Sequence, residues 1–209
     1  MEFDLRQLSN HDRYKLLTGV VVPRPIALVT TRNLEGHYNA APYSFFNAMG
    51  SDPPVVVIGV GNRQSGEPKD TAHNIRSTRE FVVNLVNEAI AEKMNITAVD
   101  FPPEEDDLAM AGLTPVPSVQ VQTPRIAESP VNLECREIAT LNIGQTRVVV
   151  GEVLHFHISD EFIDPVKLHI HTDQLHIVGR MHGGGWYVRT TDLFKIDRLT
   201  YEEWQAKMQ

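Results

Sequence analysis

The sequence has little from which a disulfide, a thiolate metal site or a membrane anchor could be built. Cys135 is the one cysteine in 209 residues, so no disulfide can form within the chain. It lies in the alternating run NLECREIATLNI, where we expect a small buried side chain rather than a nucleophile. No apolar run approaches the roughly 20 residues of a membrane helix, and the charged stretch MEFDLRQLSNHDRY is not a signal peptide. We expect a cytoplasmic protein with no membrane attachment.

Basic residues are also fewer than acidic residues. The chain has 19 Lys and Arg against 27 Asp and Glu, which gives a formal net charge of −8. Such a chain is a poor partner for nucleic acid or for an anionic membrane surface. A hydrophobic content of 42% is enough for one sizeable core, and no linker divides the sequence. We therefore predict a single domain over residues 1–209.

Sustained helical patterns are few, whereas runs of strand length and β composition are many. Residues 52–61 are apolar enough to be buried on both faces, and Pro42 suggests an edge strand or a bulge. Gly36 and Gly144 fall where hairpin turns are expected. Strands are predicted over residues 23–31, 37–46, 52–61, 80–87, 131–144 and 146–159, with shorter β structure over 175–198.

Four helical segments are predicted around these strands. The first begins at Ser9 or Asn10 and runs to Leu17. The other three cover residues 71–78, 89–99 and 200–207. The acidic stretch 100–113 is expected to be a solvated loop with a helical turn. The chain shows no repeats and no sustained alternation of strand and helix, which favours an antiparallel barrel with helices packed outside.

The segment GNRQSGEPKDTAHNI, residues 61–75, has the composition of a phosphate-binding loop. Its glycine spacing, G-x-G-x-x-x-x-G, does not fit a dinucleotide fingerprint, and no Gly-Lys-Ser/Thr follows as in a P-loop. The unpaired N–H groups of a helix that starts near Asp70, its expected N-cap, could bind an anion. Hydroxyls of Ser65 and Thr71 and charges of Arg63 and Lys69 could assist. A solvated loop with an Asp cap is the simpler alternative.

Three stretches in order resemble the flavin reductase-like family of FMN-binding split barrels. They are PRPIALVTT, then G-x-x-NAAPYSFFNAMGSDPPVVVIGV, then S-x-x-x-KDTAHNI-x-x-T-x-EFVVNLV. The resemblance is strong over residues 20–90 and weaker over 130–197, where GRMHGGGWY is similar to the family's late Gly-Gly-x-x-Tyr region. It implies a mainly β (α+β) fold, a six-stranded antiparallel split β-barrel of Greek-key type with flanking helices. It also implies a homodimer with FMN near the subunit interface.

The resemblance further implies which residues hold the cofactor. The flavin ring would lie along one strand, the preceding strand would contribute two threonines, and the loop at 61–75 would hold the phosphate. We hypothesise that His182, with Arg180, reaches the flavin or a nicotinamide and is catalytic. Tyr43 or Tyr187 could touch flavin or substrate. The full cofactor set is Thr30, Thr31, Asn39, Ala40, Ala41, Pro42, Tyr43, Ser44, Arg63, Ser65, Lys69, Asp70, Thr71, Arg180 and Tyr187.

Four functions stay open on the sequence. The first is an FMN-dependent oxidoreductase that takes a hydride from NADH or NADPH and supplies reduced flavin or electrons to a partner such as a monooxygenase. The second is a non-enzymatic FMN electron carrier. The third is an FMN enzyme that reduces a metal complex, quinone or disulfide. The fourth is a metal-binding barrel that uses the histidines of the H-x-H pairs, namely His155, His157, His169 and His171, with His176 and His182 nearby.

Overall fold

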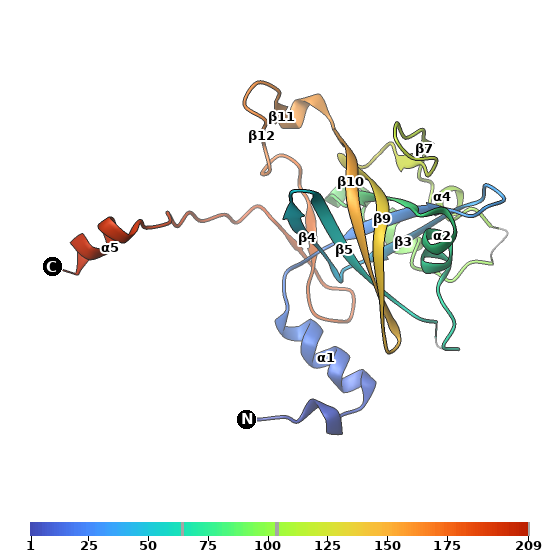
Figure 1. The fold of residues 1–209 in the computed structure, drawn as a ribbon, viewed down its shortest axis with the longest axis horizontal. Helices are drawn as coiled ribbons and strands as arrows, with labels where there is room; N and C mark the ends of the chain where they lie inside the picture. Colours follow the sequence, from blue (N-terminus) through green and yellow to red (C-terminus); the bar gives the residue numbers. More distant parts are fainter. Residues whose placement is uncertain (64, 103–104, 209) are drawn as a thin grey trace.

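A computed structural model of the protein describes residues 1–63, 65–102 and 105–208. Gln64 in the predicted phosphate loop and Pro103 and Glu104 in the acidic segment lie outside the described residues. Within this range the architecture is a strongly twisted antiparallel sheet with short helices against it (Figure 1). No helix in the described part of the chain is long and apolar enough to cross a membrane.

The main sheet has seven strands in the described residues, in the order β3-β2-β6-β9-β10-β5-β4. The long hairpin of β9 and β10 forms its centre, pairing with β6 on one side and β5 on the other. β5 also contacts β3, so the sheet curls around its core. The strands are β2 (Ala27–Arg32), β3 (Tyr38–Tyr43), β4 (Phe46–Ser51), β5 (Pro54–Gly61), β6 (Glu80–Leu85), β9 (Val131–Ile143) and β10 (Thr146–Ile158).

Small sheets and helices complete the fold. One small sheet consists of β1 (Arg24–Pro25), β13 (Val178–Arg180) and β14 (Tyr187–Arg189). A second consists of β11 (Ile163–Asp164) and β12 (His169–Ile170). A third consists of β7 (Pro115–Val116) and β8 (Arg125–Ile126). The helices are α1 (Asn10–Val20), α2 (Asp70–Thr78), α3 (Ala91–Ile96), α4 (Asp107–Met110) and α5 (Tyr201–Lys207), with 3-10 turns η1 (Leu5–Gln7), η2 (Glu88–Ile90) and η3 (Asp160–Phe162).

The β2–β3 hairpin places the candidate site, because β3 ends the sheet. The two strands pair from Ala27 with Tyr43 to Arg32 with Tyr38. Gly36 closes the turn at φ 96°, a region that residues with a Cβ avoid. β3 has β2 on one side and no other strand of this sheet on the other, so Pro42, which has no N–H to donate, is tolerated there. The prediction of an edge strand at Pro42 is confirmed.

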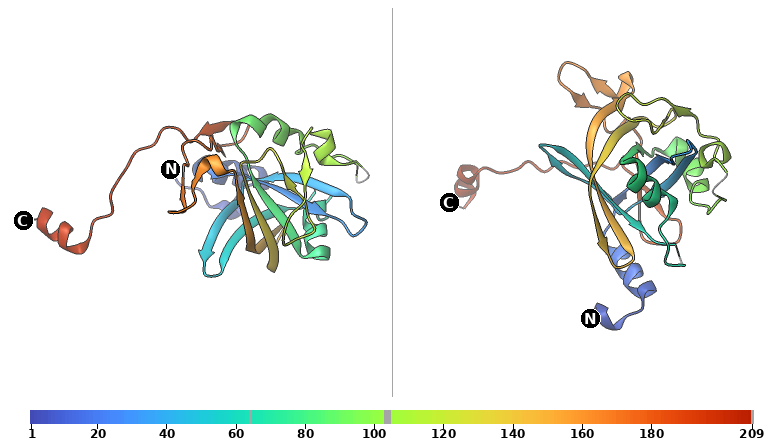
Figure 2. Two further views of the ribbon diagram at one scale, coloured as in Figure 1. Left: turned by 90° about the horizontal axis from the view of Figure 1, so that it is seen from above. Right: turned by 45° about the vertical axis from the view of Figure 1, so that its right-hand side comes forward.

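Side chains of the sheet divide between two apolar cores. The first core contains Phe81, Ile58 and Ile75, and α2 closes it. The second contains Leu28 and Met94 and is covered by α3 and α4. Because side chains alternate along a strand, neighbours on β3 enter different cores: Ala40 packs in the second, whereas Ala41 and Tyr43 pack in the first. Figure 2 shows the helices on either side of the sheet.

The C-terminal arm, residues 191–208, leaves the body of the protein. It is extended from residue 191 to residue 200 and ends in α5, at a distance from the sheet in all three views (Figures 1 and 2). Thr200 caps α5 with a complete capping box, so the helix predicted over 200–207 is confirmed. Every described residue of the arm is exposed.

Some boundaries differ from the sequence prediction. The predicted strand 37–46 stops at Tyr43, and a further strand, β4, begins at Phe46. The helix predicted over 89–99 is shorter, because a 3-10 turn precedes α3. β5 is not buried on both faces: Val56, Ile58 and Val60 are buried, and the alternate residues between them are half-exposed. Ser9 caps α1 and Gly144 turns at φ 56°, both as predicted.

Gly151 provides a test of the packing in the first core. A Cβ at this position of β10 would lie 2.3 Å from Cζ of Phe81, whose side chain is completely buried and cannot move aside. Gly151→Ala is therefore expected to lower the free energy of unfolding by about 1–3 kcal/mol in urea denaturation. Gly61→Ala in β5 is the matched control, because its Cβ would meet nothing within 4 Å. Equal losses in both variants would contradict a specific contact with Phe81.

Candidate functional site

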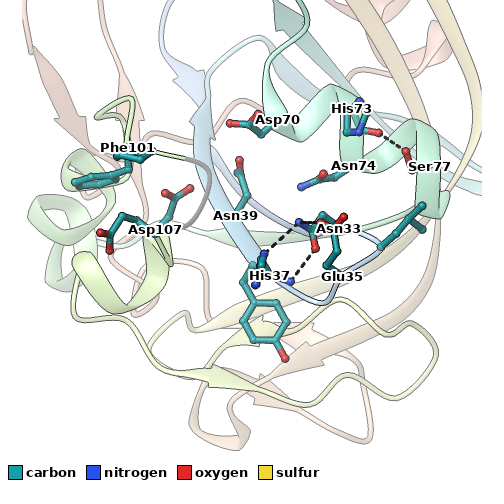
Figure 3. Close-up of a pocket in the computed structure, with 14 residues that line it drawn as sticks. Asn33, Glu35, His37, Asn39, Asp70, His73, Asn74, Ser77, Phe101 and Asp107 are labelled. Atoms are coloured by element: carbon teal, nitrogen blue, oxygen red, sulfur yellow. Dashed lines mark hydrogen bonds between the residues drawn. The ribbon is translucent and has the colours of Figure 1, made fainter.

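Three adjoining cavities follow β3, and we call them together the β3 groove. The His73 cavity, about 220 Å³, lies beside Tyr38 and Asn39 and is lined by α2 and the acidic segment (Figure 3). The Lys69 cavity, about 90 Å³, shares Asn39 with the first and continues along β3 to Tyr43. The Arg180 cavity, about 220 Å³, begins at Pro42.

The backbone of β3 presents hydrogen-bonding groups to this groove. Residues of an antiparallel edge strand face their partner and the open side alternately. The N–H of Ala40 donates to Oδ2 of Asp107 at 2.9 Å, so Ala40 faces the open side, and Pro42, two residues on, faces the same way. The groove edge therefore has a donor at Ala40 and small side chains that allow close approach by a flat ligand.

Asp107 brings a carboxylate onto this edge. Burial raises the pKa of Asp107 to about 6, and the charges of Asp70 and Asp106 act in the same direction, against the hydrogen bond from Ala40. Figure 3 shows Asp107 and Phe101 across the cavity from Asn39 and Asp70. The acidic segment is thus more than a solvated face, because its described residues form one wall of the groove.

Tyr43 and Thr71 lie at one end of the Lys69 cavity. The Tyr43 hydroxyl is buried and has no hydrogen-bond partner among the described residues. Burial raises the pKa of the Tyr43 phenol far above its usual range. Thr71 is buried in the first turn of α2, where its Oγ1 accepts a hydrogen bond from Nδ2 of Asn39 at 3.3 Å. A buried hydroxyl without a partner is costly, and a polar group of a ligand would satisfy it.

The cations of the predicted phosphate site are arranged differently from the prediction. Asp70 is not the N-cap of α2: the cap is Lys69, without a side-chain cap bond, and Asp70 is the first helical residue. The Asp70 carboxylate is held instead by Nη2 of Arg63 at 2.5 Å, and Nη1 of Arg63 lies 3.7 Å from Asp100. The hydrogen bond that Arg63 donates to the Asp70 carboxylate raises the pKa of Arg63. Lys69 forms no ion pair with the described residues, so it is the cation left for an anionic ligand.

Three predicted cofactor residues lie away from the groove. Thr30 and Thr31 are completely buried, and their hydroxyls have other partners: Thr30 donates to the Pro124 carbonyl at 2.6 Å, and Thr31 accepts from Nδ2 of Asn74 at 3.1 Å. Ser65 is exposed in the loop and lines none of the three cavities. The Thr30 and Thr31 side chains thus form hydrogen bonds inside the fold, and the Ser65 side chain has no place in the groove.

The late motif contributes to the Arg180 cavity. Ser44, Arg180 and Tyr187 line it, and the guanidinium of Arg180 lies 4.7 Å from the centre of the Tyr187 ring. His182, in the loop between β13 and β14, is exposed and lines none of the three cavities. Its Nδ1 lies 3.1 Å from the Gly183 carbonyl oxygen. Within one chain His182 is therefore not placed to act on a ligand in the groove, and its catalytic role stays a prediction.

The paired histidines have a structural explanation. The rings of His155 and His157 lie side by side, 4.6 Å apart, as the H-x-H spacing predicts. Nε2 of His157 lies 2.5 Å from Oε1 of the completely buried Glu134. Glu134 also accepts hydrogen bonds from the backbone N–H groups of Val119 and Gln120. In the part of the chain that the structure describes, no group of three or more His, Cys, Asp or Glu side chains is placed to hold a metal ion.

Asp107 gives the free energy of unfolding a specific pH dependence. Because its pKa is higher in the folded state than in an unfolded chain, the folded protein binds more protons between about pH 4 and pH 6. Its contribution to stability therefore falls as the pH rises through this interval. Asp107→Asn should remove that fall and raise the free energy of unfolding at pH 7 by about 1 kcal/mol, after allowance for partial exposure. Urea denaturation from pH 4 to pH 7 measures the difference, and identical pH profiles would contradict it.

Comparison with known proteins supports the resemblance seen in the sequence. Residues 19–179 match the family described as flavin reductase like domain. The chain is similar to the nitrilotriacetate monooxygenase component B of Bacillus cereus, with 32% identity, a TM-score of 0.89, and 94% of this chain and 98% of that chain covered. It is also similar to the 2-nitrobenzoate 2-nitroreductase NbaA of Pseudomonas fluorescens, with 39% identity, a TM-score of 0.87 and coverage of 96% and 98%.

A third neighbour identifies the fold. It is a protein of Shewanella frigidimarina with a split barrel domain, 21% identical, with a TM-score of 0.79 and coverage of 96% and 99%. At that identity the likeness concerns the fold alone. The mainly β split-barrel prediction is confirmed, and the chain belongs to the flavin reductase-like family.

Proposed function

We propose that this protein binds FMN in the β3 groove and acts as an oxidoreductase with NADH or NADPH as the reductant. The observation that carries the proposal is the open edge of β3. It combines small side chains, an outward N–H at Ala40 and, at one end, the start of α2. The unpartnered hydroxyl of Tyr43 supports the fit, because it leaves a buried donor for a polar ligand group.

The residues of the groove divide between the two ends of the cofactor. Asn39, Ala40, Ala41 and Pro42 would lie along the ring, and the N–H of Ala40, now held by Asp107, is the donor that a ring carbonyl would take. Lys69, Thr71 and Tyr43 would hold the phosphate, together with the first N–H groups of α2. Arg63 would position Asp70 rather than contact the phosphate by itself.

FMN, when bound, supplies the hydride and electron transfer, so the chain needs no acid–base pair of its own. Phe101 and Asp107 restrict water on one side of the groove. The family supports an oxidoreductase, and the likeness to a monooxygenase component B supports transfer of electrons to a partner enzyme. The likeness to a nitroreductase supports a second candidate, reduction of a small molecule at the groove itself. A pure electron carrier with the same site is the third.

One experiment separates these functions: an absorption spectrum of purified protein supplemented with FMN, then anaerobic addition of NADH or NADPH. Flavin bands that bleach at once and recover on admission of an acceptor support an oxidoreductase. Bands that persist with both nucleotides, but bleach with dithionite, favour a carrier that needs an external reductase. Protein that retains no FMN after gel filtration and shows no fluorescence change on titration would overturn the proposal.

Lys69 tests the placement of the phosphate. Lys69→Ala removes a charge-assisted contact worth about 1.5–3 kcal/mol, so FMN affinity should fall roughly ten- to a hundred-fold. Riboflavin has no phosphate and should bind almost as before, in the same fluorescence titration. Lys167→Ala, at an exposed position distant in sequence, is the control. Equal losses for FMN and riboflavin would place Lys69 at the ring or in the folding of the loop.

We further propose that the protein is a homodimer in the cytoplasm, and that the C-terminal arm lies on the second copy. The arm exposes Phe194, Ile196 and Trp204, with Phe194 at 86%. A seven-residue helix is marginal in water by itself, so α5 needs a surface. Ten extended residues reach about 33 Å, about twice the radius of gyration of a domain this size, roughly 16 Å. The arm is thus long enough to reach well over the surface of a second body.

The arm should control the oligomeric state. In the double variant Phe194→Ser with Ile196→Ser, we expect sedimentation equilibrium to give the mass of one chain at concentrations where the unchanged protein gives two. The control is Val166→Ser, which alters an exposed apolar side chain in the turn between β11 and β12. A dimer of unchanged affinity in the double variant would show that other surfaces hold the subunits together.

A further inference from the structure

Arg180 lines the Arg180 cavity, and a second arginine, Arg24, lies beside it behind the cavity wall. Arg24 on β1 is directly opposite Arg180 on β13 in the antiparallel pairing. Like charges in this position repel one another, and a protein normally avoids the arrangement or adds an acidic neighbour. Neither side chain forms an ion pair with any described residue, although the chain carries 27 Asp and Glu. No described Asp or Glu side chain pairs with either arginine, although acidic residues outnumber basic ones in this protein.

Arg24 is a buried charge that is fixed in place. Its side chain donates to the carbonyls of Thr18 and Val21, both at 2.8 Å, and of Met181 at 2.6 Å. Burial lowers the pKa of Arg24, and the charge of Arg180 acts in the same direction. Carbonyls satisfy its hydrogen bonds but do not neutralise its charge. Arg24 therefore contributes a positive potential to the cavity without itself being free to bind a ligand.

Arg180 has hydrogen-bonding capacity left. Its guanidinium lies over the Tyr187 ring and makes no hydrogen bond to the described residues. Stacking on a ring uses the face of the guanidinium and leaves the N–H groups at its edge, the geometry that binds a carboxylate with two parallel bonds. Arg180 is half-buried, so such a bond would be only partly screened by water.

Ser44 supplies a second donor to the same cavity. Its Oγ accepts a hydrogen bond from Nε of Arg24 at 3.3 Å, so its own proton is left for another acceptor. Ser44 and Arg180 both line the cavity, and the remaining lining is largely apolar or aromatic. It contains no Asp or Glu among the described residues. The apolar part is formed by Tyr14, Ile26, Pro42, Met94, Ala98 and Tyr187.

We propose that the Arg180 cavity binds a small aromatic carboxylate, with the carboxylate on Arg180 and Ser44 and the ring against Tyr187 and Met94. About 220 Å³ accommodates one substituted benzene ring. The site adjoins the proposed flavin ring at Pro42, which lines both cavities. As a substrate assignment, the inference rests on the proposed function. As a binding site, it stands on Arg180 and Ser44, with Arg24 contributing positive potential. It assigns Arg180 and Ser44 to the acid rather than to FMN.

The test compares benzoate with benzamide, a neutral molecule of nearly the same shape. Titration calorimetry or ligand-observed NMR on the full chain should show benzoate binding that weakens as salt is added, and benzamide binding at least ten-fold weaker. Arg180→Gln should weaken benzoate at least ten-fold and leave benzamide unchanged. Arg180→Lys keeps the charge but loses the fork, and should be intermediate. Arg136→Gln, at an exposed position of β9 that lines none of the three cavities, is the matched control and should bind as the unchanged protein does.

A nucleotide phosphate is the other anion that could occupy this position, and pyrophosphate is the probe for it. Pyrophosphate that displaces benzoate and binds more tightly, through Arg180, would overturn the proposal in favour of a nucleotide site. Failure of the unchanged protein to bind benzoate, or a benzoate affinity indifferent to Arg180→Gln, would also overturn it. Parallel titration with FMN keeps the two proposals apart. Benzoate binding without flavin binding would refute the proposed function alone, and flavin binding without benzoate would refute this inference alone.

Discussion

The site depends on β3 having a single neighbour in the main sheet. Every interior strand uses both of its backbone edges for pairing, whereas β3 pairs with β2 and keeps its other edge open. Exposed edges invite unwanted pairing, and here Pro42 and the carboxylate of Asp107 prevent it. The features that protect the edge also shape the groove: Pro42 separates two cavities, and Asp107 holds the donor at Ala40. Protection of the edge and the proposed ligand binding would therefore use the same few atoms.

Charge is distributed unevenly along the groove. Carboxylates of Asp70, Asp100 and Asp107 stand around the Lys69 cavity and outnumber its two cations, whereas the Arg180 cavity has no acid in the described residues. A ligand with two negative groups would therefore meet a compensated field at one end and an uncompensated one at the other. The electrostatic potential differs along β3 although none of its side chains is charged, because the flanking elements set it.

Local features of the fold could be read from the sequence. The β2–β3 hairpin, its turn at Gly36 and the burial of Cys135 follow from composition and alternation within a few residues. Long-range pairs could not be read in this way. Arg24 faces Arg180 across 156 positions of sequence, and His157 reaches Glu134 only because a bulge sets the register of the long hairpin. Such partners depend on tertiary register, which no local pattern encodes.

The candidate site shows the same limit. The order of the motifs predicts that the residues from Asn39 to Tyr43 share one site with Lys69 and Thr71. The structure places all of them around one cavity. The pairing of Asp70 with Arg63 was missed because an Asp before a helix is normally a cap, and its alternative partner comes from the preceding loop. Thr30 and Thr31 were assigned by family position. Their inward orientation follows from cores on both faces of β2, which a single-strand reading does not reveal.

The short strand β14 has a consequence of its own. It carries Tyr187, which lines the Arg180 cavity. The strand ends at Arg189, and the exposed arm begins two residues later, at residue 191. Because β14 is only three residues long, a contact that fixes Tyr187 at its start also restricts the position of the chain at its end. If an acid binds against Tyr187 and a neighbouring subunit holds the arm, as proposed, the two events would be thermodynamically linked, and the coupling would be reciprocal. The cavity would sense protein concentration, and subunit affinity would sense the acid.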